Sequence, residues 1–318
     1  MKLFLLFFTQ IALTMFMLSP ISASQYPDKP VKIVIGYPPG GGTDVLGRYI
    51  FSKIAERTGK TIIIENLSGA TGIIGTRHVS SSDPDGYTLL LGHISPNAIN
   101  PGDFFLPRSP PDWNVLPVAR IATAPSLLLV RPETKIRTLI DFKKWLRSNP
   151  DTFYGSDGIG SLAHLQMVNL LAGRTRDPIH IPYKGGAPAL QAIMSNDIPI
   201  MFSPLPVALG LMSSDKFTII AQTGEKRSAI LSNLPTMAEQ GEPDFVAVLW
   251  WGLFSPVGVS TDIRKYWEIE LSKTLSQPDV IEWLNKYGYT AAFLSSSVFT
   301  QYVESEKMKW VSVIKNIH

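Results

Sequence analysis

The chain has 318 residues against a common domain size of about 100–200, which favours two domains. Hydrophobic residues make up 45% and charged residues 17%, a balance that excludes a disordered chain. The net charge is +3 and no long Lys/Arg block occurs, so no nucleic-acid partner is expected. The chain has no cysteine, which excludes disulfides, thiolate chemistry, cysteine-based zinc sites and a lipid-modified cysteine anchor.

The N-terminus has the pattern of a secretory signal peptide. Lys2 precedes an apolar run that continues to about Leu18, and the small residues Ser22-Ala23-Ser24 follow. This pattern predicts export, with residues 1–24 removed by cleavage after Ala23 or Ser24. The alternative is an uncleaved membrane anchor, but the run of ~16 residues is shorter than the ~20 that a spanning helix needs.

The rest of the chain alternates between short apolar segments and helical patterns, which is typical of parallel sheets flanked by helices. The predicted strands are 31–35, 61–64, 87–91, 127–130, 152–156, 179–182, 198–202, 217–221 and 246–254. The predicted helices are 43–59, 139–146, 161–172, 186–195, 204–213, 261–276, 278–287 and 295–315. The stretch from Pro101 to Pro117 is rich in proline and is interpreted as surface. The expected fold class is α/β.

A glycine-rich loop, Pro38 to Asp44, joins the first predicted strand to the first predicted helix. Its three glycines let a ligand approach the backbone closely, because no side chain intervenes. The helix that follows offers free N–H groups and a partial positive charge, a combination that binds anions. The loop lacks the Gly-Lys-Ser/Thr sequence of a phosphate-binding Walker loop. The alternative is a tight turn in which Thr43 or Asp44 caps the helix.

A second loop of the same kind spans Tyr154 to Ser161, again between a predicted strand and a predicted helix. His164 lies one turn into that helix. A third turn, Pro182 to Gly186, also follows a strand and precedes a helix. The chain therefore contains two anion-friendly loops, plausibly one in each domain.

Motifs for catalysis or metal binding are weak. None of the five histidines pairs at zinc-site spacing, and no Gly-x-Ser-x-Gly elbow is present. An exported serine hydrolase using Ser156 or Ser161 with His164 is the rival interpretation, although nearness in sequence does not establish catalytic geometry. Lys184 is interpreted as a surface lysine. Trp250-Trp251 is interpreted as core or interdomain packing, with stacking on a ligand as the alternative. No catalytic residue, metal or cofactor is expected.

Short motifs stand in the order found in one known family. They are Tyr26–Pro30, Pro38–Asp44, Glu65-Asn66 with Gly69–Gly72, Pro84–Leu90, Gly155-Ser156 through His164-Leu165, His180–Gly185, Met201-Phe202, Glu225–Ser228, Leu234–Thr236 and Trp251–Phe254. Over essentially the whole mature chain, the sequence resembles the solute receptors of tripartite tricarboxylate transporters, the Bug/TctC family. Each motif alone is weak, but the ordered set is specific.

The resemblance implies a periplasmic-binding-protein-like fold of two domains, each a mostly parallel sheet flanked by helices. A small organic carboxylate would bind in the cleft between them without undergoing any reaction. The receptor would present this ligand to membrane permease subunits or to a sensor kinase, and it is expected to be a monomer. Domain one would comprise 26–125 plus 247–318 and domain two 126–246, with hinges at Ala124-Pro125 and Ala247-Val248.

The family's ligand-facing turns correspond here to Gly41–Asp44 and to residues between Ser156 and His164, with Tyr183–Gly186 as a weaker correspondence. The full candidate set is Tyr37, Gly41, Gly42, Thr43, Asp44, Ser95, Ser156, Gly160, Ser161, His164, Tyr183, Gly185 and Ser203. Two of the departures from the family pattern are Leu67-Ser68, where many members carry Arg-Pro, and His93, in a loop that is often Ser or Thr. They affect the identity of the ligand more than the fold.

Overall fold

The computed structural model describes residues 26–99, 115–172 and 178–315. The predicted signal peptide and most of the proline-rich stretch lie outside these ranges. The strands are β1 (Val31–Ile35), β2 (Ile62–Asn66), β3 (Thr88–His93), β4 (Val115–Val130), β5 (Phe153–Ser156), β6 (Ile179–Pro182), β7 (Ile200–Pro204), β8 (Thr218–Gln222), β9 (Val248–Pro256) and β10 (Thr290–Leu294). The α-helices are α2 (Gly42–Thr58), α3 (Ile73–Ser80), α5 (Leu139–Ser148), α6 (Leu162–Leu171), α7 (Gly186–Met194), α8 (Leu205–Ala208), α9 (Thr261–Leu275), α10 (Pro278–Lys286) and α11 (Ser296–Lys315).

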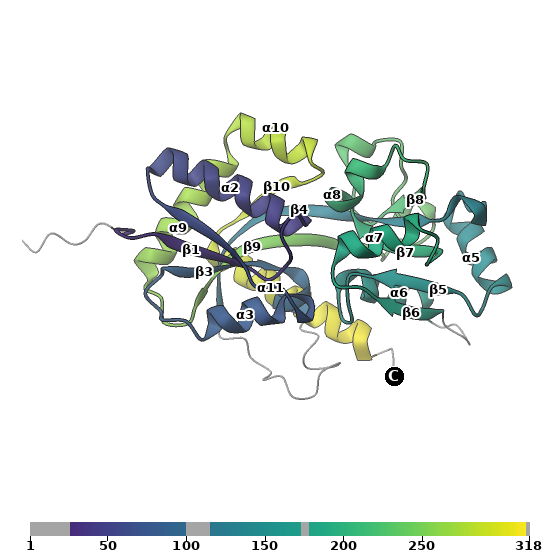
Figure 1. Ribbon diagram of the computed structural model, residues 1–318, viewed down its shortest axis with the longest axis horizontal. Coiled ribbons are helices and arrows are strands. Elements are labelled where there is room, and N and C mark those ends of the chain that lie inside the picture. The colour runs from purple at the N-terminus through teal and green to yellow at the C-terminus, as the bar shows by residue number, and fades with distance from the viewer. Residues whose placement is uncertain (1–25, 100–114, 173–177, 316–318) are drawn as a thin grey trace, which may run out of the picture.

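The strands join into one sheet with the order β2-β1-β3-β9-β4-β7-β5-β6, and both β8 and β10 pair with β4. The pairs β1–β2, β1–β3, β5–β6 and β5–β7 are parallel, as the alternation of strands and helices predicts. The pairs that involve β4 or β9 are antiparallel, so each half of the sheet is mixed rather than mostly parallel. The reason is that β4 leaves the first half of the molecule, whereas β9 returns to it in the opposite direction (Figure 1).

The long strand β4 connects the two halves. Its residues Val115–Pro125 pair with β9, and its residues Ser126–Val130 pair with β7 and β8. The sequence analysis predicted only 127–130 as strand, because prolines interrupt the segment before it. The structure accommodates Pro117 next to a register shift in the β4–β9 ladder, where a missing N–H costs least.

The buried apolar side chains form separate clusters in the two halves, and the clusters divide where the chain passes from one half to the other. One cluster contains residues from Val31 to Ala124 and from Ala247 to Ile314, together with Leu162 and Leu165 of α6. Two further clusters contain residues between Leu127 and Phe245. Trp250 lies in the first cluster against Phe254 and Phe299, as core packing requires.

Three elements differ from the sequence-based expectation. Helix α3 and strand β10 were not predicted: α3 is only eight residues long and starts at a glycine in the left-handed region, and the pairing of β10 is irregular. The predicted helix 204–213 is reduced to α8, whose first turn accommodates Pro206, and a 3-10 turn at Leu209–Leu211, where Gly210 disfavours a continued α-helix.

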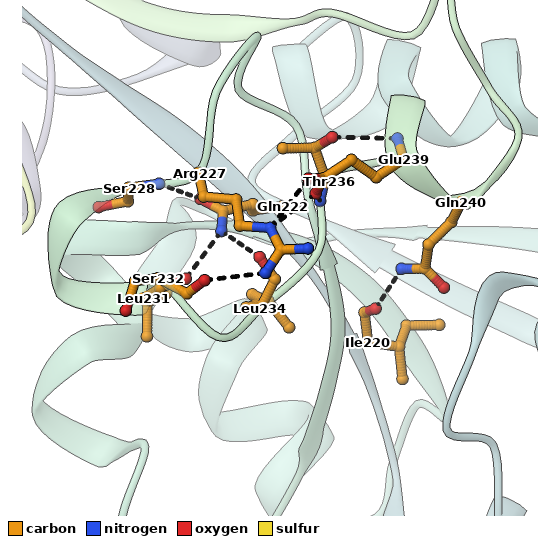
Figure 2. Close-up of polar contacts among 10 residues, drawn as sticks. All are labelled: Ile220, Gln222, Arg227, Ser228, Leu231, Ser232, Leu234, Thr236, Glu239 and Gln240. Carbon is orange, nitrogen blue, oxygen red and sulfur yellow. Dashed lines mark hydrogen bonds and ion pairs between the residues drawn. The ribbon is translucent and has the colours of Figure 1, made fainter.

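Two motifs of the family pattern, 225–228 and 234–236, build a loop after β8 rather than a cavity wall (Figure 2). The buried side chain of Gln222 holds this loop: its Nε2 donates to the carbonyls of Leu231 and Leu234, and its Oε1 accepts from the N–H of Ser228. Arg227 adds a two-oxygen contact to Glu239, whose Oε2 also accepts from the N–H of Thr236. These motifs therefore have a structural role.

Replacing Gln222 tests this role. Gln222→Leu leaves three backbone groups without their partner, so the free energy of unfolding should fall by about 2–4 kcal/mol. Chemical denaturation measures the loss. The matched control is Gln191→Leu on the exposed face of α7, which should change stability by no more than about 0.5 kcal/mol. Equal effects of the two substitutions would contradict the assignment.

Candidate functional site

Two adjoining cavities lie where loops from the two halves of the molecule meet. The smaller has a volume of about 190 Å³ and is lined by Tyr37–Thr43, His93, Asp157, Lys184–Pro188, Pro204, Pro206, Val207, Leu249 and Trp251. The larger has a volume of about 690 Å³ and is lined by Gly36–Pro38, Ser68–Ile73, Asp157–Ile159 and Pro182–Gly185. The cavities share Tyr37, Pro38, Asp157, Lys184 and Gly185, so together they form one cleft.

The N-terminus of α2 forms one wall of the smaller cavity. The N–H groups of Gly42 and Thr43 have no acceptor among the described residues. The first N–H groups of a helix point outward along its axis and have no partner within the helix. This end of α2 therefore presents free donors and a partial positive charge to the cavity.

The N-terminus of α7 forms the opposite wall. Gly186 and Ala187 line the cavity, and their N–H groups likewise meet no acceptor in the described part of the chain. Val207 lies between the two helix ends, because a Cβ built at Gly42 or at Gly186 would come within 3.6 Å or 3.5 Å of its side chain. The exposed side chain of Lys184 lines the same cavity and forms no ion pair with the described residues.

The start of α2 is held in place from several parts of the chain. Trp251 Nε1 donates to the Thr43 hydroxyl at 2.9 Å, and the Tyr289 hydroxyl donates to the Gly42 carbonyl at 2.7 Å. Asp44 accepts from the N–H of Gly40 at 2.9 Å and forms an ion pair with Arg48. Burial raises the pKa of Asp44, but the hydrogen bonds from Arg48, Gly40 and Asn66 outweigh it, so the pKa lies below its usual value.

Donors of the second predicted loop and of the start of α6 are already paired. The N–H of Gly158 donates to Ser156 Oγ, that of Gly160 to His164 Nδ1, and that of Leu162 to Ser95 Oγ. The Ser161 hydroxyl caps α6 by accepting from the N–H of His164. The start of α6 therefore offers few free N–H groups to an anion, in contrast to the starts of α2 and α7.

Of the predicted site residues, the structure brings six to the cleft: Tyr37, Gly41, Gly42, Thr43, Tyr183 and Gly185. Seven do not line either cavity: Asp44, Ser95, Ser156, Gly160, Ser161, His164 and Ser203. The predicted site lacked Asp157, Trp251 and the α7 residues Ala187 and Pro188, although the weaker correspondence did reach Gly186, the first residue of that helix. Asp157 stands inside the predicted loop, so its position was a usable signal. Both Trp250 and Trp251 lie in the core cluster, as predicted, and only the fold shows that Trp251 is the one that also lines the cleft.

The rival hydrolase interpretation finds no support in this geometry. Ser156 Oγ is 2.7 Å from His180 Nε2, whereas His164 accepts from the N–H of Gly160 and stacks on His180 at 4.0 Å. Ser156 is fully buried, and Ser161 is engaged as a helix cap. A nucleophile must face the site where a substrate binds, and neither serine lines the cleft. The described residues also contain no group of three or more metal-ligating side chains placed to hold an ion.

Known proteins place the chain in one family. The model of the tripartite tricarboxylate transporter family receptor matches residues 46–318. The chain belongs to this receptor family. BugT of Bordetella pertussis is 30% identical over 304 residues, which cover 93% of this chain and 92% of BugT. The resemblance inferred from the ordered motifs is thus confirmed.

Solved structures of receptors confirm the α/β periplasmic-binding-protein-like fold. R. palustris Rpa4515 with adipate is 28% identical with a TM-score of 0.86, and the match covers 92% of this chain and 98% of that one. MatC from Rhodopseudomonas palustris with bound malate is 29% identical with a TM-score of 0.82, covering 91% and 100%. Among the helices in the described ranges of this receptor, none is long and apolar enough to cross a membrane.

Two buried histidines, His93 and His164, and the partly buried His180 give a testable dependence on pH. Burial lowers the pKa of His93 to about 3 and that of His180 to about 4, and burial together with the charge of His180 lowers that of His164 to about 3. The unfolded chain takes up these protons near pH 6.5, before the folded chain does. The free energy of unfolding should therefore fall as the pH falls from about 6.5 to 4.

His180→Gln should remove part of this slope. With a discount for the partial exposure of His180, the part that it removes between pH 7.5 and 4.5 is about 1–2 kcal/mol. Urea denaturation at several pH values measures the slope separately from any constant loss of stability. His78→Gln, at an exposed position on α3, is the matched control. An unchanged slope in His180→Gln would show that His180 is not held neutral.

Proposed function

We propose that this protein is an exported receptor that captures a small organic carboxylate in the cleft and presents it to a tripartite tricarboxylate-type permease. The observation that carries the proposal is the meeting of two helix N-termini, α2 and α7, with unpaired N–H groups in one cavity. A carboxylate accepts several such bonds at once, and the partial positive charges of both helix ends favour its negative charge. The adipate and malate in the two related structures agree with this chemistry.

The signal-peptide pattern and the family together support a periplasmic location. The same receptor could serve a sensor kinase instead of a permease, and co-purification from membranes distinguishes the two partners. The ligand should be recovered unchanged after incubation, which separates a receptor from the rival hydrolase. We propose that the receptor acts as a monomer.

A thermal-shift screen over mono-, di- and tricarboxylates, amino acids and nicotinate-like acids identifies the ligand class. A compound at ~100 times its Kd stabilises the folded state by about 2.7 kcal/mol, which such a screen detects easily. Phosphate and sulfate serve as controls for anion binding of any kind. If none of the carboxylates raises the melting temperature, the proposed function is wrong.

Gly42→Val tests the anion site at α2. The added Cβ has room, with the Tyr289 hydroxyl at 3.4 Å, but the methyl groups would enter the space between the helix end and Val207. Loss of one or two charge-assisted contacts should weaken binding of the best carboxylate from the screen at least about 100-fold, or roughly 3 kcal/mol. Calorimetry measures the affinity. Gly210→Val, where no atom lies within 4 Å of the new Cβ, is the control. Unchanged affinity in a folded Gly42→Val protein would show that the loop is only a structural turn and does not bind the ligand.

We further propose that the halves are the two domains expected from the sequence, with hinges at the crossing segments 124–125 and 247–248. Thr223 supports this placement by joining both crossings: its hydroxyl accepts from the N–H of Ser126 and donates to the carbonyl of Ala247. Across the cleft, the Thr71 hydroxyl donates to the carbonyl of Ile159 at 3.2 Å. This contact must break if the cleft opens.

Closure of the cleft on ligand binding should change the radius of gyration measurably. A ligand that touches both α2 and α7 binds only the closed arrangement tightly, so it should shift the population toward that arrangement. The radius of gyration should decrease by roughly 1 Å when ligand saturates the protein. This estimate is set against the radius of gyration expected of a compact chain of this length. Small-angle scattering with and without ligand measures the change. Identical curves would refute the hinge while leaving the binding proposal intact.

A further inference from the structure

The charged side chains of the cleft are few and unevenly placed. Asp157 and Lys184 are the only Asp, Glu, Lys or Arg residues that line either cavity in the described part of the chain, and both stand where the cavities adjoin. Beyond the shared residues, the larger cavity is lined by small and apolar residues, of which Ile73, Ile159 and Pro182 are the bulkiest besides Tyr183. The larger cavity therefore has no cation of its own to neutralise a second carboxylate.

Helix ends do not supply the missing positive charge to the larger cavity. Helix α3 begins at the larger cavity, but its first N–H groups are already used: those of Gly72 and Ile74 donate to the Gly69 carbonyl, and that of Ile73 donates to Ala70. At the start of α6, the N–H of Gly158 is engaged with Ser156. An anion is stabilised at a helix end only where N–H groups are free to reach it. Free donors at helix ends, among the described residues, thus face the smaller cavity, whereas the larger cavity offers N–H groups of loops, such as those of Ser68 to Thr71, which carry no helix-end charge.

Asp157 adds a negative group at the junction. Its Oδ1 is buried and meets no hydrogen-bond donor among the described residues. Burial raises the pKa of its carboxyl, and this effect exceeds the lowering by the Ser161 hydroxyl. A buried carboxyl oxygen without a donor is costly, and a second anion beside it adds repulsion. Asp157 lines both cavities, so a ligand group beside it avoids this repulsion if it is a neutral donor rather than a second carboxylate.

We infer that the ligand is a monoanionic carboxylic acid with an apolar body and a neutral hydrogen-bond donor, and that Asp157 is the residue that excludes a second carboxylate. This inference rests on the proposed function. The single carboxylate occupies the smaller cavity between α2 and α7, and the apolar body occupies the larger cavity. The donor group, such as a carboxamide or hydroxyl, reaches Asp157. The preference would differ from that of the relatives that hold adipate and malate.

Matched ligands that differ in their number of carboxylates test this inference on the unmodified protein. Adipate, its monoamide adipamate and hexanoate have the same chain length but differ in the far group, and terephthalate and 4-carbamoylbenzoate make the same comparison with a ring. Calorimetry on the mature protein at pH 7.5 should show each monoamide binding at least tenfold more tightly than the corresponding diacid. Hexanoate should lie between adipamate and adipate, because it lacks both the repulsion and the donor.

Two variants assign the discrimination to a residue. Asp157→Asn removes the negative charge at nearly constant shape, so it should strengthen binding of adipate about tenfold. The affinities for adipate and adipamate should then lie within threefold of each other. Asp197→Asn, an exposed aspartate in the turn after α7 that does not line the cleft, should leave the ratio unchanged. Melting curves of both variants verify that they fold.

The outcomes separate this inference from the function on which it rests. Adipate binding as tightly as adipamate in the unmodified protein would overturn the inference while leaving a carboxylate receptor in place. A tenfold preference that persists in folded Asp157→Asn would overturn the role of Asp157. If all five probes and the carboxylate screen fail to bind, the carboxylate function falls, and the inference falls with it.

Discussion

The first N–H groups of an α-helix have no partners inside the helix, and in this receptor two helices leave such groups facing one small cavity. Elsewhere in a protein these groups are covered by side-chain caps, and α6 shows that arrangement with Ser161. At α2 and α7 the positions before the helix are glycines, Gly41 and Gly185, which provide no capping side chain. A ligand that supplies acceptor oxygens then takes the place of the cap.

The position of these helix ends depends on contacts from distant parts of the chain. Trp251 of β9 and Tyr289, just before β10, bind the first turn of α2, and Asp44 within that turn binds the loop before it. The ion pair of Asp44 with Arg48 keeps the buried carboxylate charged, so that it can accept from the glycine loop. The residues that shape the anion site are thus largely different from those that would touch the anion.

The two crossing strands give the site its division into halves. Strands β4 and β9 run antiparallel through the middle of the sheet, and the halves on either side contribute α2 and α7 (Figure 1). Under the proposed hinge, a change at the crossings would move one wall of the cleft relative to the other. The electrostatic balance across the cleft is equally simple, with one acid and one base at the junction of the cavities. A single substitution there can therefore alter which charge a ligand is allowed to carry.

The sequence by itself determined the fold class, the family and most strands and helices, because apolar periodicity and glycine turns are local signals. It also located the α2 loop and the turn before α7, because their glycines are most simply explained by close approach of a ligand to the backbone. Only the tertiary structure decided that Asp44 binds the loop before its own helix and that the N–H groups of Gly158, Gly160 and Leu162 are already paired. It also decided that Asp157 and Trp251 reach the cleft. It also revealed α3 and β10, whose signals are too short to stand out. The physical reason is that a hydrogen-bond donor is free or engaged according to its neighbours in space, and those neighbours come from segments far apart in the chain.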